Sequence, residues 1–298
     1  MDAKLMECVP NFSEGRDLEK IDRIVAPFRG KPKVKLLDYQ RDEDHNRLVV
    51  TVIGEPDALK ICLLDAVAQA ISLIDMRAHR GQHPRMGAVD VVPFVPIRNM
   101  SMAEAVDFSK QVGKELADRF SLPVFLYEAS AANPARSNLA DIRKGEFEKM
   151  PEKLTMDAWK PDFGPVAVHP TAGVTAVGAR NPLVAFNVFL TTQDIAIARK
   201  IAKAVRHKDG GLRFCKAMGV AVEARRQVQV SMNMTDFSQT PLYRVLELIR
   251  AEAKRFGVTV SGSEIVGLVP MAALTNCAAY YLGLEHFSLA QVMETHLI

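Results

Sequence analysis

The amino-acid sequence predicts an α+β protein, in the form of an α/β sandwich, that consists of two βαββαβ units with a ligand groove between them. Two observations support this prediction: short apolar strands and amphipathic helices alternate in that order in the N-terminal third, and the C-terminal third repeats the order. Such an order is typical of ferredoxin-like folds, in which helices cover one face of an antiparallel sheet. The 298 residues suffice for two modest domains, and 48% of them are hydrophobic, which is enough for two cores.

The N-terminal third carries the first βαββαβ pattern. Apolar residues recur at helical spacing between residues 17 and 28, for example Ile21, Ile24 and Phe28. Gly54 ends one strand and Pro96 ends another. The expected strands cover residues 4–9, 34–39, 48–53 and 89–95, and the expected helices cover 17–28 and 57–76.

The C-terminal third carries the second pattern, with Ile195, Ala198 and Ile201 on one helical face. Its expected strands cover residues 183–190, 220–223, 228–232 and 258–261, and its expected helices cover 192–205 and 242–256. Between the two patterns we expect a helix at 102–120, a strand at 124–127, a charged surface segment at 138–153 and a break at 161–165. The sequence therefore predicts domains 1–180 and 181–298, and interfaces between domains are common ligand sites.

Composition excludes several classes of protein. The formal charge of +3 comes without a basic stripe, so we expect no nucleic-acid partner. The N-terminus has no apolar signal region and no run is long enough to span a bilayer, so we expect a cytoplasmic protein without membrane contact. The cysteines are far apart and form no C-x-x-C pair, which predicts reduced thiols rather than a zinc knuckle or disulfides: Cys8, Cys62, Cys215 and Cys277.

Two polar loops are candidate binding segments. Residues 10–15 follow a strand and precede a helix, where backbone amides can hold a carboxylate and Asn11 and Ser13 can add hydrogen bonds. The alternative, which the local pattern favours, is a plain turn with Ser13 as the helix cap. Residues 42–47 form either a solvated hairpin turn or a polar edge of the groove, with His45 facing the groove or water.

A third loop, residues 77–87, contains two histidines. Gly81 and Pro84 prevent a helix there, so His79 and His83 do not share a helical face, and this disfavours a metal site. Pro84 also restricts the backbone of His83 to extended angles.

Positive charge surrounds His83 in the sequence, from Arg77, Arg80 and Arg85. Positive neighbours keep an imidazole neutral, and a neutral imidazole is the form that a general base needs. The pattern is equally compatible with solvated arginines and a structural turn histidine.

Several motifs in order resemble the formiminotransferase domain of glutamate formimidoyltransferases, which is also the first half of the bifunctional formiminotransferase–cyclodeaminase. The resemblance covers nearly the whole chain. Its motifs are Glu7-Cys8-Val9-Pro10-Asn11-Phe12-Ser13-Glu14-Gly15, Leu73-Ile74-Asp75-Met76, Gly81-Gln82-His83-Pro84-Arg85-Met86-Gly87-Ala88-Val89-Asp90, Pro151-Glu152-Lys153-Leu154, Pro161-Asp162-Phe163-Gly164-Pro165, Gly178-Ala179-Arg180, Ala185-Phe186-Asn187 and Val266-Gly267-Leu268-Val269-Pro270.

The resemblance implies an activity. The family transfers a formimino group from N-formimino-L-glutamate to N5 of tetrahydrofolate, in histidine degradation and one-carbon metabolism. It implies tetrahydrofolate as co-substrate without a metal, a homodimer, His83 as the base in the N-terminal domain, and a separate cyclodeaminase as a possible partner, since the chain stops at Ile298.

The resemblance also implies where the substrates bind. Arginines are the natural partners of the substrate carboxylates. Gln40 stands where some relatives have an acid beside Asp38, so Asp42 or Asp44 would have to orient the base. His169 and Thr171 also differ from the residues of relatives. The expected binding residues are Asn11, Asp38, His45, Asn46, Arg47, Arg85 and Arg180, together with Gly164, Pro165, Val168, Pro170 and Gly173 around the folate.

Other functions remain compatible with the sequence. The same scaffold could process 5-formyl-tetrahydrofolate or transfer a formyl group, although no Walker-type phosphate loop is present. A non-catalytic folate-binding protein is the alternative from another class. The scattered acids and histidines lack the spacing of a metal hydrolase.

Overall fold

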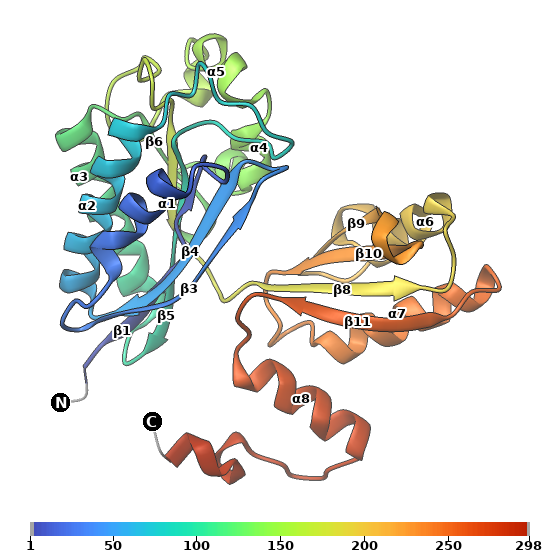
Figure 1. Cartoon of the computed structure of the whole chain (residues 1–298). Helices are drawn as coiled ribbons and strands as arrows, with labels where there is room; N and C mark the ends of the chain where they lie inside the picture. Colours follow the sequence, from blue (N-terminus) through green and yellow to red (C-terminus); the bar gives the residue numbers. More distant parts are fainter. Residues whose placement is uncertain (1–2, 297–298) are drawn as a thin grey trace. The chain divides into compact units, whose positions relative to one another are not determined.

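The protein is described by a computed structural model that covers residues 3–296, and the chain divides into two compact units at the bond between Arg180 and Asn181. We call them unit 1, which ends at Arg180, and unit 2, which begins at Asn181. Each unit combines helices with its own β-sheet (Figure 1). The predicted α+β class is therefore confirmed.

The described part of unit 1 forms one seven-stranded sheet. Its strands are β1 (Leu5–Cys8), β2 (Asn11–Phe12), β3 (Val34–Asp42), β4 (Arg47–Gly54), β5 (Val89–Arg98), β6 (Val124–Leu126) and β7 (Thr175–Ala179). Its α-helices are α1 (Leu18–Val25), α2 (Pro56–Leu73), α3 (Met102–Phe120), α4 (Leu139–Arg143) and α5 (Glu146–Lys153).

The strand order of unit 1 contains a ferredoxin-like core. β4 pairs with β3 on one side and with both β1 and β2 on the other, and β1 and β2 pair in turn with β5, all antiparallel. This is the βαββαβ arrangement that the sequence predicts. β7 and β6 then extend the sheet parallel to β5, after the crossover helix α3. The strand at β7 was not expected.

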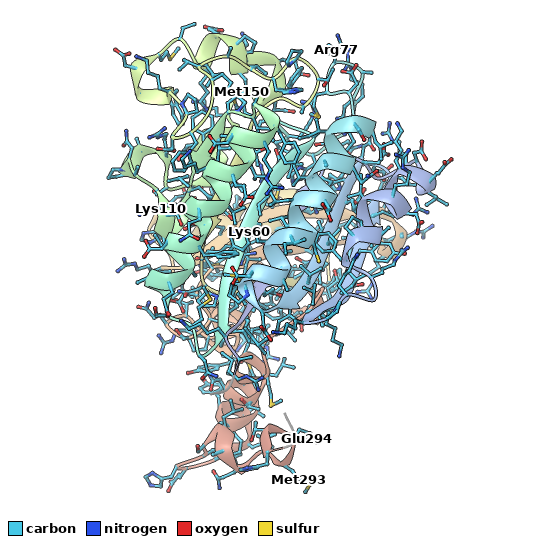
Figure 2. All side chains as sticks on the ribbon, turned by 90° about the vertical axis from the view of Figure 1, so that its left-hand side faces the viewer. Lys60, Arg77, Lys110, Met150, Met293 and Glu294 are labelled. Atoms are coloured by element: carbon cyan, nitrogen blue, oxygen red, sulfur yellow. The ribbon has the colours of Figure 1, made fainter. Side chains whose placement is uncertain are left out.

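Helices α1, α2 and α3 pack on one face of this sheet and enclose the larger core (Figure 1). Alternate residues of the strands point into it, such as Met6 and Cys8 of β1 and Leu48 of β4. Figure 2 views the unit from this helical side, with Lys60 on α2 and Lys110 on α3.

A second core cluster lies on the opposite face, where the sheet is extended by β6 and β7. Segment 138–153 covers it, with Ile142, Met150 and Lys153 buried. Most of this segment lies at the surface, as expected, but these three residues are buried. Among its charged residues are apolar ones, such as Ile142 of α4 and Met150 of α5, which pack into this second core cluster.

Unit 2 repeats the antiparallel arrangement with the strand order β11-β8-β10-β9, as predicted. The strands are β8 (Val184–Leu190), β9 (Cys215–Val222), β10 (Gln227–Met234) and β11 (Val260–Val266), and the α-helices are α6 (Ile195–Val205), α7 (Leu242–Arg255) and α8 (Met271–Leu282). α8 was not expected from the sequence. None of the helices in residues 3–296 is long and apolar enough to cross a membrane.

Two leucine-sized side chains of α2 test the position of the core. Leu63 is fully buried, whereas Ile61 is 61% exposed. We expect Leu63→Ala to lower the free energy of unfolding of unit 1 by about 2–5 kcal/mol, because it leaves a cavity. Ile61→Ala is the matched control and should change it by less than about 0.5 kcal/mol. The chain has one tryptophan, Trp159, and it lies in unit 1, so its fluorescence during urea unfolding reports this transition. Equal effects of both substitutions would contradict the packing.

Candidate active site

The three polar loops that the sequence singles out meet in unit 1, and Asn46 joins them. The Asn46 side chain accepts a hydrogen bond from Gly15 N at 2.8 Å and donates one to Arg80 O at 3.1 Å. His79 Nε2 donates to the Asn46 carbonyl at 3.0 Å. Asn46 has a φ of 48°, in the left-handed region that asparagine tolerates better than most residues. One buried residue therefore holds both neighbouring loops.

Close backbone packing fixes the loop of residues 42–47 from two sides. A Cβ atom at Gly15 would lie 2.2 Å from Asp42 O, and one at Gly81 would lie 2.2 Å from His45 O. Gln82 N adds a hydrogen bond to Asp44 O at 3.1 Å. Glycine is thus required at both positions for the loops to approach so closely.

Ser13 does not cap the first helix, which was the use that the local pattern favoured. Asp17 is the cap of α1, and its side chain accepts from Glu19 N and Lys20 N. Ser13 is buried and its hydroxyl donates to Gly87 O at 2.8 Å. Ser13 therefore connects the first loop to the segment that follows His83.

His83 is half-buried beside a second histidine. Its ring centroid lies 6.1 Å from that of His45, with the rings nearly perpendicular at 83°. Asp42 binds His45, which donates from Nδ1 at 2.6 Å and from its backbone N at 2.8 Å. Asp42, one of the two acids expected to compensate for Gln40, thus orients His45, the neighbour of His83.

The surroundings of His83 strongly disfavour its charged form. Burial, together with the positive charges of Arg47 and Arg143, lowers the pKa of His83 to about 3, and the charge of Asp42 opposes this shift only in part. The imidazole is therefore neutral throughout the neutral pH range. The sequence also predicts a neutral His83, but it attributes this to Arg77, Arg80 and Arg85 rather than to Arg47 and Arg143.

The arginines next to His83 in the sequence have other partners. Arg77 is exposed and pairs with Asp75 at 2.6 Å, and Arg80 donates to the carbonyls of its own loop. The buried guanidinium of Arg85 bridges two carboxylates of α5, at 2.5 Å from Glu146 and 2.6 Å from Glu148. These contacts favour a structural role for Arg85 over the predicted contact with substrate.

Arg47, the first residue of β4, has a different environment. Its Nε is buried and has no hydrogen-bond partner among the described residues. Burial is also the main cause that lowers the pKa of Arg47, followed by the charge of Arg143. An unpaired polar atom on a largely buried cation is costly, and an anionic ligand would relieve that cost.

Arg143 and Asp90 belong to the site although sequence reasoning missed them. Arg143, the last residue of α4, donates from Nε to Asp90 at 2.8 Å. The other oxygen of Asp90 accepts from Met86 N at 2.8 Å. Asp90 stands at a register shift of β5, between the partners of Asn11 and Phe12. The sequence did offer one signal: Asp90 is an acidic residue inside the otherwise apolar start of β5.

The predicted folate loop lies next to the His83 loop. Gly173 forms a bridge with Gly87, and Val174 N donates to Met86 O at 3.0 Å. The backbone conformation explains why glycine stands at two positions of this loop. φ is 86° at Gly164 and 75° at Gly173, and a Cβ atom at Gly173 would lie 2.2 Å from Met86 O. In the same loop, Val168 packs on the second core cluster, whereas two prolines are exposed: Pro165 and Pro170.

The other predicted binding residues are spread along the same sheet. Asn11 is half-buried on β2, where its side chain donates to Val9 O at 2.9 Å. Asp38 lies on the edge strand β3 and accepts from Gln40 at 2.9 Å. Arg180 follows β7, where its charge acts on Glu7. The structure thus brings His45 and Arg47 to His83 and bonds Asn46 to the same loop through Arg80 O. It places Asp38 on β3 and Arg180 after β7.

No group of three histidine, cysteine, aspartate or glutamate side chains that could hold a metal ion occurs in residues 3–296. The four cysteines are free thiols. The chemistry that this arrangement can support is proton transfer by a neutral imidazole next to a guanidinium that has a nitrogen free for an anion.

Comparison with protein families gives matches over almost the entire chain. Residues 5–180 match the N-terminal subdomain of the formiminotransferase domain, and residues 185–298 match the formiminotransferase domain. The matched segments leave only a short stretch between them.

Individual relatives agree with these matches. A glutamate formimidoyltransferase of Streptococcus pyogenes serotype M1 is 52% identical over 99% of both chains, and one of Thermoplasma acidophilum is 44% identical over 97% of this chain and 96% of its own. A formimidoyltransferase-cyclodeaminase of Rattus norvegicus is 44% identical over 95% of this chain, which covers 53% of the rat protein.

Substitution of Asn46 tests whether it joins the loops. We expect Asn46→Ala to lower the free energy of unfolding of unit 1 by about 2–4 kcal/mol, because buried hydrogen-bond partners lose their contacts and alanine is strained at positive φ. Asn46→Gly removes the same hydrogen bonds without that strain and should recover about 1 kcal/mol of the loss. Trp159 fluorescence in urea measures both. A loss below about 0.5 kcal/mol for Asn46→Ala would show that the loops are held by other contacts.

Proposed function

Because the chain belongs to the formiminotransferase domain family, we propose that it transfers the formimino group of N-formimino-L-glutamate to N5 of tetrahydrofolate. The products are glutamate and 5-formimino-tetrahydrofolate. The protein is a one-carbon transferase, a glutamate formimidoyltransferase like the relatives that match its full length. The observation that supports this chemistry best is the neutral imidazole of His83 beside the unpaired Nε of Arg47.

His83 acts as the general base in this proposal. The lone pair of N5 attacks the carbon of the protonated amidine, the π pair of the C=N bond moves onto its terminal nitrogen, and N5 must lose its proton as the new C–N bond forms. His83 is neutral and accepts that proton. The tetrahedral centre then collapses with cleavage of the bond between this carbon and the glutamate nitrogen, and His83 returns the proton to that nitrogen. The lone pair of the terminal nitrogen re-forms the C=N bond as the glutamate nitrogen leaves, so atoms and charge balance without an oxidant.

Arg47 binds a carboxylate of the glutamyl substrate. Of the three arginines expected to bind carboxylates, Arg85 already bridges two acids, whereas Arg47 has an unpaired Nε. A base with a pKa near 3 accepts a proton poorly. A carboxylate on Arg47 would cancel one of the charges that lower this pKa, so substrate binding makes His83 a better base.

Reduced folate binds along the loop of residues 164–173, which hydrogen-bonds to the segment after His83. The protein acts as a cytoplasmic homodimer. Its product passes to a cyclodeaminase, an activity that the name of the rat relative includes in the same chain.

Substitution of the base tests the function directly. We expect His83→Asn to lower kcat for formimino transfer by about 10²–10⁴-fold, because the amide cannot accept the proton of N5. The matched control is His207→Asn, at an exposed histidine of unit 2, which should retain full activity. Mass spectrometry of the folate product separates formimino transfer from formyl transfer. Full activity of folded His83→Asn would refute the role of His83, and folate binding without release of glutamate by the wild type would indicate a non-catalytic protein.

Substitution of Arg47 tests the carboxylate site. We expect Arg47→Gln to raise KM for formiminoglutamate by about 10- to 100-fold, because a charge-assisted hydrogen bond is lost. Removal of its charge also raises the pKa of His83, so the acid limb of the kcat/KM profile should move upward in pH. The control is Arg77→Gln, at the exposed arginine that pairs with Asp75. An unchanged KM together with an unchanged acid limb would exclude Arg47 from the site.

A further inference from the structure

Lys153 is a buried lysine whose role the proposed reaction leaves open. It is the last residue of α5 and lies in the Pro151-Glu152-Lys153-Leu154 motif. Its ammonium group lies 3.9 Å from the ring centroid of Trp159. Burial lowers the pKa of Lys153 to about 8. Lysine is rarely buried to this degree unless its charge has specific partners.

The partners of Lys153 are backbone carbonyls at the end of α4. Nζ donates to Asp141 O at 2.6 Å, to Ile142 O at 2.6 Å and to Lys144 O at 3.3 Å. The last carbonyls of a helix lack partners within the helix and carry its negative dipole end, so a cation is favourable there. α4 has only five residues, and a helix so short depends on tertiary contacts for its position.

The turn that Lys153 holds carries Arg143 into the active site. Arg143 pairs with Asp90, which accepts from Met86 N in the segment after His83. The charge of Arg143 acts on both His83 and Arg47. The carbonyl contacts of Lys153 on both sides of Arg143 therefore limit how far this guanidinium can withdraw.

We propose that Lys153 is a positioning residue of the transferase site: it fixes the C-terminal turn of α4 and thereby holds the Arg143 guanidinium beside His83 and Arg47. The inference rests on the proposed function for the catalytic role of His83. It assigns a task to Lys153, and it makes Arg143 a second cation of the site. Arg143 adds positive charge where the anionic substrate binds, and in the free protein its charge helps to lower the pKa of His83.

The test uses Lys153→Met in the full chain, because methionine fills a similar volume without the donors. Lys149→Met is the matched control: Lys149 lies on the same helix, but it is exposed and only reaches Glu152 at 3.8 Å. Circular dichroism and thermal unfolding establish that both variants fold. We expect kcat/KM for formimino transfer to fall by about 10- to 100-fold in Lys153→Met, the size of effect that small misplacements in an active site cause, and to stay unchanged in Lys149→Met.

Two further readouts distinguish positioning from simple stabilisation. Withdrawal of the Arg143 charge raises the pKa of His83, so the NMR titration midpoint of the His83 imidazole should rise in Lys153→Met and in Arg143→Gln, but not in Lys149→Met. In a double-mutant cycle, Lys153→Met should add little to the loss of Arg143→Gln, because both act through the same guanidinium.

The outcomes separate this inference from the proposed function. If the wild type shows no formimino transfer but the His83 midpoint rises in Lys153→Met, the proposed function fails and the positioning role stands. If the wild type is active, the positioning role is overturned by a folded Lys153→Met that matches Lys149→Met in both readouts, or by additive losses in the cycle. Loss of the folded state in Lys153→Met would also overturn it, since Lys153 would then be a stabilising residue.

Discussion

The left-handed backbone of Asn46, with its hydrogen bonds to the two neighbouring loops, is the constraint on which the site depends. Gly15 N and Arg80 O bind its side chain, and His79 binds its carbonyl. These hydrogen bonds hold the turn between β3 and β4 in place. They thereby fix the positions of Asp42, His45 and Arg47, the first residue of β4, relative to His83. Without it, the polar loops would be the solvated turns that their composition alone suggests.

The electrostatics of the site follow from this packing. Burial and two arginines lower the pKa of His83 to about 3, while Arg47 keeps an unpaired Nε. An arrangement that leaves a base weak and a cation unsatisfied is unfavourable for the ligand-free protein, and functional sites commonly carry such costs. In the proposed function, an anionic substrate on Arg47 would relieve both at once. The affinity for substrate and the strength of the base are therefore linked through Arg47 in this account.

The sequence predicts local features better than the contacts between distant segments. The βαββαβ order is readable because strand and helix periodicities depend on neighbouring residues. His83 is different: its local pattern fits a structural turn histidine equally well, and only the family resemblance identifies it as the base. The neighbours of His83 were misassigned to Arg77, Arg80 and Arg85, since adjacency in sequence is no guide to where long side chains turn. Arg143 was missed because its contact with Asp90 spans 53 positions, and the charged composition of 138–153 concealed buried residues.

The most direct test of the account is an NMR titration of the His83 imidazole in the free protein and with saturating glutamate, the reaction product that carries the same carboxylates. The account predicts that the free protein shows a neutral ring between about pH 5 and 8, and that glutamate raises the titration midpoint because it neutralises Arg47. A midpoint near the ordinary histidine value of about 6.5 in the free protein, unchanged by glutamate, would contradict it.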